Sequence, residues 1–144
     1  MKFKITKPLV GAFILLLFSS NLFAKSKISV DIINIESNEG QLIVYLHNTP
    51  EFFPMEKERA YKVIKSKIKN NKAYIELTNI PDGEYAIAVH HDENGNDEVD
   101  TNFLGIPNED FGASNNAKGF MGPPSFKDAS FKVLKDLKLT IDMD

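Results

Sequence analysis

The chain has 144 residues, of which 26% are charged, and its 17 basic residues stand against 20 acidic ones for a net charge of −3. This acidic balance argues against nucleic acid as a partner, because binding phosphates requires a basic face. The absence of cysteine excludes disulfide bonds and thiol chemistry, so the stability of the fold must come from its apolar core.

The first 24 residues are expected to form a cleaved secretory signal peptide. Lys2, Lys4 and Lys7 make a positive start, residues 9–18 form an unbroken apolar run, and residues 22–24 (Leu-Phe-Ala) provide a cleavage site. An uncleaved anchor is the alternative, but this run falls short of the roughly 20 residues that a spanning helix needs. We therefore expect export to the periplasm or out of the cell, with no membrane span after cleavage.

Cleavage would leave residues 25–144 as one domain. Three of the 17 basic residues lie in the signal segment, so this domain would carry 14 basic and 20 acidic residues, a net charge of −6. About 120 residues are enough for one hydrophobic core but not comfortably for two. The charge suits a dispersed, soluble domain with room for a bound cation.

The first half of this domain has the pattern of β-strands. From Ile28, apolar and polar residues alternate, and the alternation slips after Ile32, which predicts a bulge or the end of a strand. Residues 41–47 are apolar on both faces and predict a central strand. Residues 48–58 contain two prolines and predict a connection with a short helical turn.

Further strands are expected along the rest of the chain, at residues 63–68, 73–77, 84–91, 129–134 and 137–143. The segment that contains Pro81, Gly83 and Tyr85 resembles the Pro-x-Gly-x-Tyr hairpin entry of prealbumin-like and collagen-adhesin B-type domains. In this interpretation the proline sets a turn, the glycine accepts a positive φ, and the tyrosine closes the end of the sandwich. The predicted fold is all-β, a single immunoglobulin-like or transthyretin-like antiparallel sandwich of about seven strands.

Residues 92–125 show no clear strand and are expected to form a long, ordered cap loop over one end of the sandwich. Glycines and prolines supply its turns. Its apolar residues are expected to pack down on the sandwich, and they are Phe103, Leu104, Ile106, Phe111, Phe120 and Met121.

The start of this loop resembles part of an EF-hand calcium loop. Asp92, Asn94, Asn96 and Asp100 place side-chain oxygens at relative positions 1, 3, 5 and 9, and Glu98 would offer its backbone carbonyl. Calcium prefers six to eight hard oxygen ligands, which alternate residues of a tight loop can supply. These five residues are the candidate ligands for Ca²⁺.

Two positions depart from the calcium pattern. Asp97 stands at the sixth position, where the motif has glycine, although aspartate tolerates the left-handed conformation better than most residues. Phe103 stands at the twelfth, where a bidentate glutamate is expected. A solvated acidic turn therefore stays open as the alternative to a calcium loop.

The histidines next to this loop offer a different chemistry. His90 and His91 are neighbours on a predicted strand, so their side chains point to opposite faces. A zinc site needs three or four converging ligands, and His47 is the only other histidine. A hydrolase or other enzyme that uses His90 or His91 with carboxylates of the acidic loop is the alternative function. No catalytic residue is assigned.

Four sequence runs resemble the signature of the bacterial family called domain of unknown function 2141. They are residues 90–96 (His-His-Asp-Glu-Asn-Gly-Asn), 100–107 (Asp-Thr-Asn-Phe-Leu-Gly-Ile-Pro), 112–117 (Gly-Ala-Ser-Asn-Asn-Ala) and 122–126 (Gly-Pro-Pro-Ser-Phe). The resemblance covers essentially the whole mature chain. It implies an exported β-sandwich protein and no known activity, substrate or catalytic residue.

The leading hypothesis is a non-catalytic exported binding or structural module. Its partner would be an envelope protein, a glycan or a small molecule, and calcium would order the cap. The candidate binding surface consists of His91, Phe103, Phe111, Asn115, Asn116 and Phe120.

Overall fold

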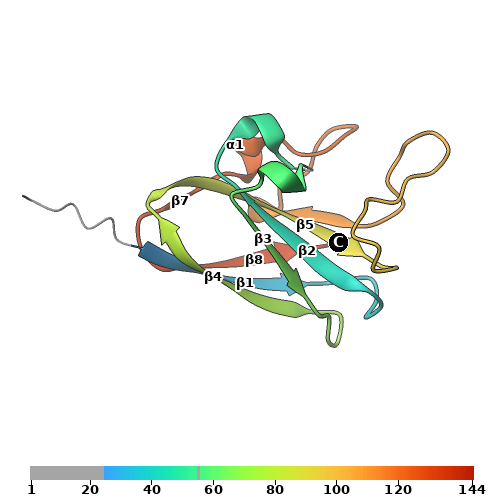
Figure 1. Ribbon diagram of the computed structural model, residues 1–144, viewed down its shortest axis with the longest axis horizontal. Helices are drawn as coiled ribbons and strands as arrows, with labels where there is room; N and C mark the ends of the chain where they lie inside the picture. Colours follow the sequence, from blue (N-terminus) through green and yellow to red (C-terminus); the bar gives the residue numbers. More distant parts are fainter. Residues whose placement is uncertain (1–24, 55) are drawn as a thin grey trace, which may run out of the picture.

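The computed structural model describes residues 25–54 and 56–144, so the expected signal peptide lies outside the described residues. These residues form eight strands, one short α-helix and three 3-10 helices at Pro50–Phe52, Lys57–Arg59 and Ser114–Asn116 (Figure 1). No helix among them is long and apolar enough to cross a membrane. The elements are β1 (Lys25–Ile33), β2 (Gln41–His47), β3 (Lys62–Ser66), β4 (Ala73–Pro81), β5 (Gly83–Asp92), β6 (Phe111–Ala113), α1 (Phe126–Ala129), β7 (Phe131–Val133) and β8 (Leu137–Asp142).

The strands form two sheets, which confirms the all-β prediction. The first sheet has the order β4-β1-β8, in which β1 pairs antiparallel with β4 and parallel with β8. The second has the order β3-β2-β5-β6, and β7 pairs with the first residues of β5. The predicted central position of residues 41–47 is confirmed, because β2 lies between β3 and β5.

The main core lies between the two sheets. The predicted alternation of β1 is confirmed, since Ile28, Val30 and Ile32 are fully buried. The slip in the pattern marks the end of β1 at Ile33, followed by Asn34 in the left-handed conformation. From the other sheet, the inward residues of β2 and β5 complete the core, among them Leu42, Val44, Leu46, Ile87 and Val89.

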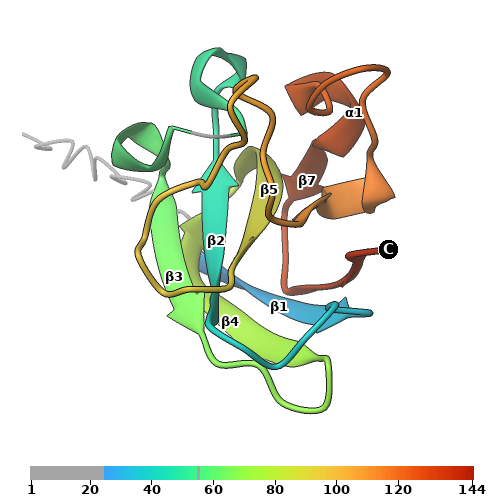
Figure 2. The same ribbon diagram turned by 90° about the vertical axis from the view of Figure 1, so that its right-hand side faces the viewer.

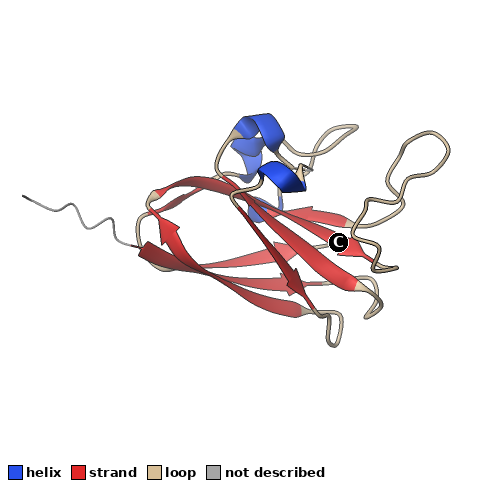
Figure 3. Cartoon of the chain, viewed as in Figure 1, coloured by secondary structure: helices blue, strands red, loops and turns tan. Residues whose placement is uncertain are grey.

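The second sheet is covered on its outer face as well. Phe53 and Ala60 of the 50–60 segment pack on Ile43, Tyr45 and Ala88. Phe126 of α1 joins a neighbouring cluster on the same face. Figures 2 and 3 show the helical turns gathered over this one sheet. This partial third layer explains why β2 is apolar on both faces.

The segment around Pro81 is a corner rather than a hairpin, because β4 and β5 belong to different sheets. The prediction of a positive φ at Gly83 is wrong, and the glycine instead lies in close contact with the ring of Tyr85. A Cβ there would lie 3.1 Å from Cε2 of Tyr85. The buried Tyr85 donates a hydrogen bond from its hydroxyl to the carbonyl of Pro81 at 3.0 Å. The tyrosine therefore fixes the point where the chain changes sheets.

The region near the C-terminus differs from the expectation in its boundaries. The strand predicted for residues 129–134 covers only Phe131–Val133, because Ala129 ends the helical turn α1. Ser125 caps this turn by accepting a hydrogen bond from the amide of Asp128 at 3.2 Å. The expected cap region also contains the short strand β6, which three residues are too few to reveal by periodicity.

Candidate functional site

Five of the six apolar side chains of the expected cap are exposed and do not pack on the sandwich, so the prediction is wrong for them. Phe111 is the exception, because it is half-buried and its ring stacks on His90 of β5. Phe103 is 95% exposed and Leu104 is 68% exposed. The physical reason is that residues 101–107 close on themselves. The amide of Asn102 donates to the carbonyl of Ile106 at 2.8 Å, and Thr101 pairs with Pro107. The two arms of this loop therefore bond to each other and carry its tip away from the core.

A second loop, residues 117–124, presents a similar tip. Phe120 is 96% exposed and Met121 is 93% exposed, and Met121 adopts a left-handed φ of 62°. Figures 1 and 2 show both loops extending from the sandwich on the same side as α1. We call Phe103, Leu104, Phe120 and Met121 the apolar tips.

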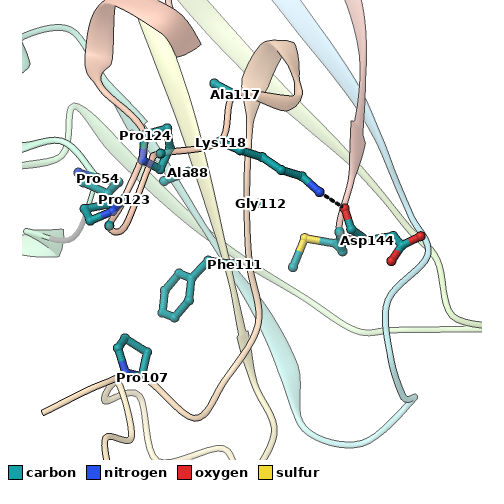
Figure 4. Close-up of a pocket in the computed structure, with 13 residues that line it drawn as sticks. Pro54, Ala88, Pro107, Phe111, Gly112, Ala117, Lys118, Pro123, Pro124 and Asp144 are labelled. Carbon is teal, nitrogen blue, oxygen red and sulfur yellow. Dashed lines mark hydrogen bonds between the residues drawn. The ribbon is translucent and has the colours of Figure 1, made fainter. Parts of the chain in front are cut away.

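An apolar groove of about 410 Å³ lies between the bases of the two loops (Figure 4). Phe111 and Gly112 of β6 line it together with Pro107 of the first loop and Pro124 of the second. A Cβ at Gly112 would lie 2.7 Å from Sδ of Met143 and 3.0 Å from Cγ2 of Ile141, so a larger residue there would displace the side chain of Met143. The groove is therefore formed where β6 approaches the end of β8.

Phe111, which lines the groove, packs against a buried pair of polar side chains, His90 and Glu109. The ring of Phe111 stacks on His90 with centroids 4.7 Å apart and planes 5° apart. Nε2 of the fully buried His90 lies 2.7 Å from Oε2 of Glu109. Glu109 is buried too, and its carboxylate accepts hydrogen bonds from the amides of Glu93 at 3.1 Å and Asp100 at 3.0 Å. One carboxylate thus connects β5, the acidic loop and the aromatic side chain that lines the groove.

The pKa of Glu109 is set by two opposing effects. Burial by itself would raise the pKa, but the amide of Asp100, the imidazole of His90 and the amide of Glu93 together hold the pKa below its usual value. A carboxylate that accepts several hydrogen bonds is favoured in its charged form. Glu109 is therefore an ionised structural group at neutral pH.

The acidic loop is organised around Asp92, which is fully buried. Its Oδ1 accepts hydrogen bonds from the amides of Gly95 at 2.9 Å and Asn96 at 3.1 Å. Its Oδ2 accepts from the amide of Asp97 at 3.0 Å and from Nε2 of Gln41 at 2.8 Å. Burial would raise the pKa of Asp92, but these hydrogen bonds outweigh it and lower the pKa.

The structure brings three of the five predicted calcium ligands together, namely Asn94, Asn96 and Asp100. The side-chain amides of Asn94 and Asn96 both reach the carboxylate of Asp100. Asp97 has a φ of 66°, the left-handed conformation that the motif assigns to glycine. The amide of Glu98 donates to Oδ1 of Asn96 at 2.8 Å, so this side-chain oxygen already has a partner within the loop.

Within the described part of the chain, no group of three or more His, Cys, Asp or Glu side chains is arranged to hold a metal ion. The predicted calcium set does not depend on such a group, since it has two carboxylates and two amide side chains. Calcium binding by this loop stays a prediction.

The histidines lie inside the protein. His91, assigned to the binding surface by the sequence, is fully buried, and its Nε2 lies 3.0 Å from the carbonyl oxygen of Glu39. His47 is buried beside Phe53, and its burial lowers the pKa of the imidazole. With His90 also buried, none of the three imidazoles meets solvent, so the alternative of an enzyme based on His90 or His91 gains no support.

The other predicted surface residues take different positions. Phe103 and Phe120 are exposed at the apolar tips, and Phe111 lines the groove. Asn115 donates from its side chain to the carbonyls of residues 128 and 130, at 3.1 and 2.8 Å. Asn116 accepts from the amide of residue 142 at 3.0 Å. These hydrogen bonds attach the turn at residues 114–116 to the neighbouring segments. Both asparagines have positive φ values.

Two residues that organise this site have no clear sequence signal. Glu109 lies 19 residues from His90, and Gln41 lies 51 residues from Asp92. Both contacts depend on which strands pair, and no local pattern carries that information. The single signal for Glu109 is an acidic residue at the end of a long loop.

These features define a class of small all-β domain, in which a rigid polar loop supports an apolar groove with exposed apolar tips. The model of the family described as "Uncharacterized protein conserved in bacteria (DUF2141)" matches residues 30–142. The chain therefore belongs to this family, as its sequence runs had indicated. No curated protein and no solved structure gave a significant match.

Proposed function

We propose that this chain is an exported, non-catalytic binding module that holds its partner at the apolar groove and the apolar tips. The observation that carries the proposal is the exposure of four large apolar side chains on both sides of one groove. Exposed apolar patches of this kind mark binding surfaces, and concave apolar sites are the usual ligand sites. An immunoglobulin-like or transthyretin-like topology belongs to the same proposal, and the tyrosine at the sheet-changing corner supports it.

The internal hydrogen bonds of the loops support a preformed site. The first loop closes on itself, and Glu109 ties its base to His90. Binding to a surface that is already ordered avoids the entropic cost of ordering it. Export is supported by the charge and apolar pattern of residues 1–24.

A neutral apolar peptide tests the binding proposal. We expect the blocked peptide Ala-Leu-Phe-Gln-Gln-Ala, added to residues 25–144, to shift the NMR amide signals of Gly112 and Gly119 at millimolar concentration. The double substitution Phe120→Ser with Met121→Ser should weaken this binding by about tenfold, because it removes one apolar tip.

Leu134→Ser is the matched control, since Leu134 is also an exposed apolar residue but lies after β7. It should leave the affinity unchanged. Signal shifts scattered over the whole surface, or equal weakening by the control, would contradict a site at the groove.

We also propose that the loop at residues 92–100 binds calcium, supported by the closeness of the side chains of Asn94, Asn96 and Asp100. The two amide groups donate to Asp100 from nitrogen in this structure, so they would turn their oxygens toward the ion when it binds. If the dissociation constant is about 0.1 mM, 5 mM calcium should stabilise the domain by about 2 kcal/mol relative to EDTA. Thermal unfolding measures this stabilisation. Asp100→Asn should abolish it, because the substitution removes one of the two ligand charges, and magnesium serves as the ion control. An unchanged melting temperature in calcium would exclude a site of this affinity.

A further inference from the structure

The apolar groove continues into an acidic hollow. This second hollow is lined by Asn34, Glu36 and Asp110, and it shares Met143 and Asp144 with the groove. The side chain of Met143 is buried, so it forms the floor where the two meet. A single extended ligand can therefore contact an apolar surface and a carboxylate-rich one at the same time.

The carboxylates of this hollow lack cationic partners. Among the ion pairs of the described residues, none joins a lysine or an arginine to Glu36, Glu93 or Asp110. A hydrogen bond with the side chain of Asp110, and then the charges of Asp110 and Glu93, raise the pKa of Glu36. Lys118 is close by, but its Nζ donates to the backbone carbonyl of Asp144 at 2.6 Å. Lys118 therefore lies at the Asp144 end of the hollow, and the carboxylates of Glu36 and Asp110 have no lysine or arginine partner among the described residues.

From the joined groove and hollow and from the unpaired carboxylates, and resting on the proposed function, we infer that the partner is a peptide segment that places a large apolar side chain in the groove and a lysine or arginine in the acidic hollow. The negative charge of the hollow favours a basic peptide over two other possible occupants, a second copy of the chain and a membrane surface. A second copy of the chain would bring the same acidic surface against itself, and an anionic membrane surface would be repelled as well. A basic, apolar peptide satisfies both parts of the site.

The experiment compares three blocked peptides with residues 25–144, which contain every described element of the fold. They are Ala-Leu-Phe-Lys-Arg-Ala, the neutral Ala-Leu-Phe-Gln-Gln-Ala, and Ala-Ser-Ser-Lys-Arg-Ala, which keeps the charge but lacks the apolar pair. Affinities are measured by NMR titration at low and at physiological salt. We expect the first peptide to bind about tenfold more tightly than either of the others at low salt, with the preference over the neutral peptide reduced by added salt.

The double variant Glu36→Gln with Asp110→Asn should remove the preference for the cationic peptide and leave the neutral peptide's affinity unchanged. Glu51→Gln with Glu58→Gln removes the same number of charges from the 50–60 segment and should preserve the preference. Equal affinity of wild-type protein for the cationic and neutral peptides would overturn this inference but not the proposed function. The absence of binding by all three peptides at millimolar concentration would overturn both.

Discussion

Replacing Asp92 by alanine is expected to lower the free energy of unfolding by about 3 kcal/mol at neutral pH. The carboxylate is fully buried and accepts four hydrogen bonds, three from loop amides and one from the side chain of Gln41. Alanine removes the acceptor and leaves the donors without partners. Urea unfolding of residues 25–144 in EDTA measures the loss in the absence of calcium.

Glu98→Gln is the control for this prediction. Glu98 is an exposed acid of the same loop, and surface substitutions of this kind usually change stability by less than about 0.5 kcal/mol. Similar losses in the two variants would show that the net charge of the loop, and not the buried acceptor, sets its stability. A loss below about 1 kcal/mol for Asp92→Ala would mean that water readily replaces the carboxylate.

The strands that could be predicted from the sequence are those whose burial is decided by local alternation. In β1, every second residue is buried in the core, so the alternation of Ile28, Val30 and Ile32 with polar residues was enough to predict the strand and its buried face. In β2, apolar residues on both faces indicated a central strand, and the covering by Phe53 explains the second face. The corner at Pro81 had the right residues for a turn, but only pairing shows that the chain changes sheets there.

The sequence predicted the tight acidic loop of the candidate site but did not predict the apolar groove. The spacing of Asp92, Asn94 and Asn96 indicated a tight loop because each contact spans only a few residues. The groove depends on the approach of β6 to β8, between Gly112 and Met143, which are far apart in the sequence. The direction of the apolar tips depends on hydrogen bonds between the arms of one loop. The apolar composition of the cap therefore predicted that its tips would be buried, whereas the structure exposes them.

The internal bonding and the exposed tips are parts of one arrangement. A loop tip that carries Phe103 into solvent gains no stability from burying it, so its conformation has to be held by other contacts. Asp92 and Glu109 supply such contacts, because their buried carboxylates accept hydrogen bonds from backbone amides of the acidic loop. The two buried carboxylates therefore stabilise the segment from which the first apolar tip extends.

Glu109→Gln is expected to lower the free energy of unfolding by roughly 2–3 kcal/mol at pH 7. In either orientation, glutamine replaces one carboxylate oxygen with an NH2 group that cannot accept a hydrogen bond. At the Oε2 position this group would face Nε2 of His90 and the amide of Asp100, and at the Oε1 position it would face the amide of Glu93. The ring of Phe111 stacks on His90, so the groove should also lose order. Urea unfolding measures the stability, and the NMR signal of Gly112 reports on the groove.

The pH dependence gives this prediction its sharper test. The pKa of Glu109 lies below its usual value of 4.5 in the folded protein. The stability that this lowering provides is therefore complete above about pH 4.5 and is lost as the pH falls through the folded pKa. Glutamine does not titrate, so the difference in unfolding free energy between wild type and Glu109→Gln should narrow from pH 5 to pH 3. Asp92 titrates in both proteins and cancels from the difference. A difference that stays constant over this range would mean that Glu109 stabilises the loop by packing and not by its charge.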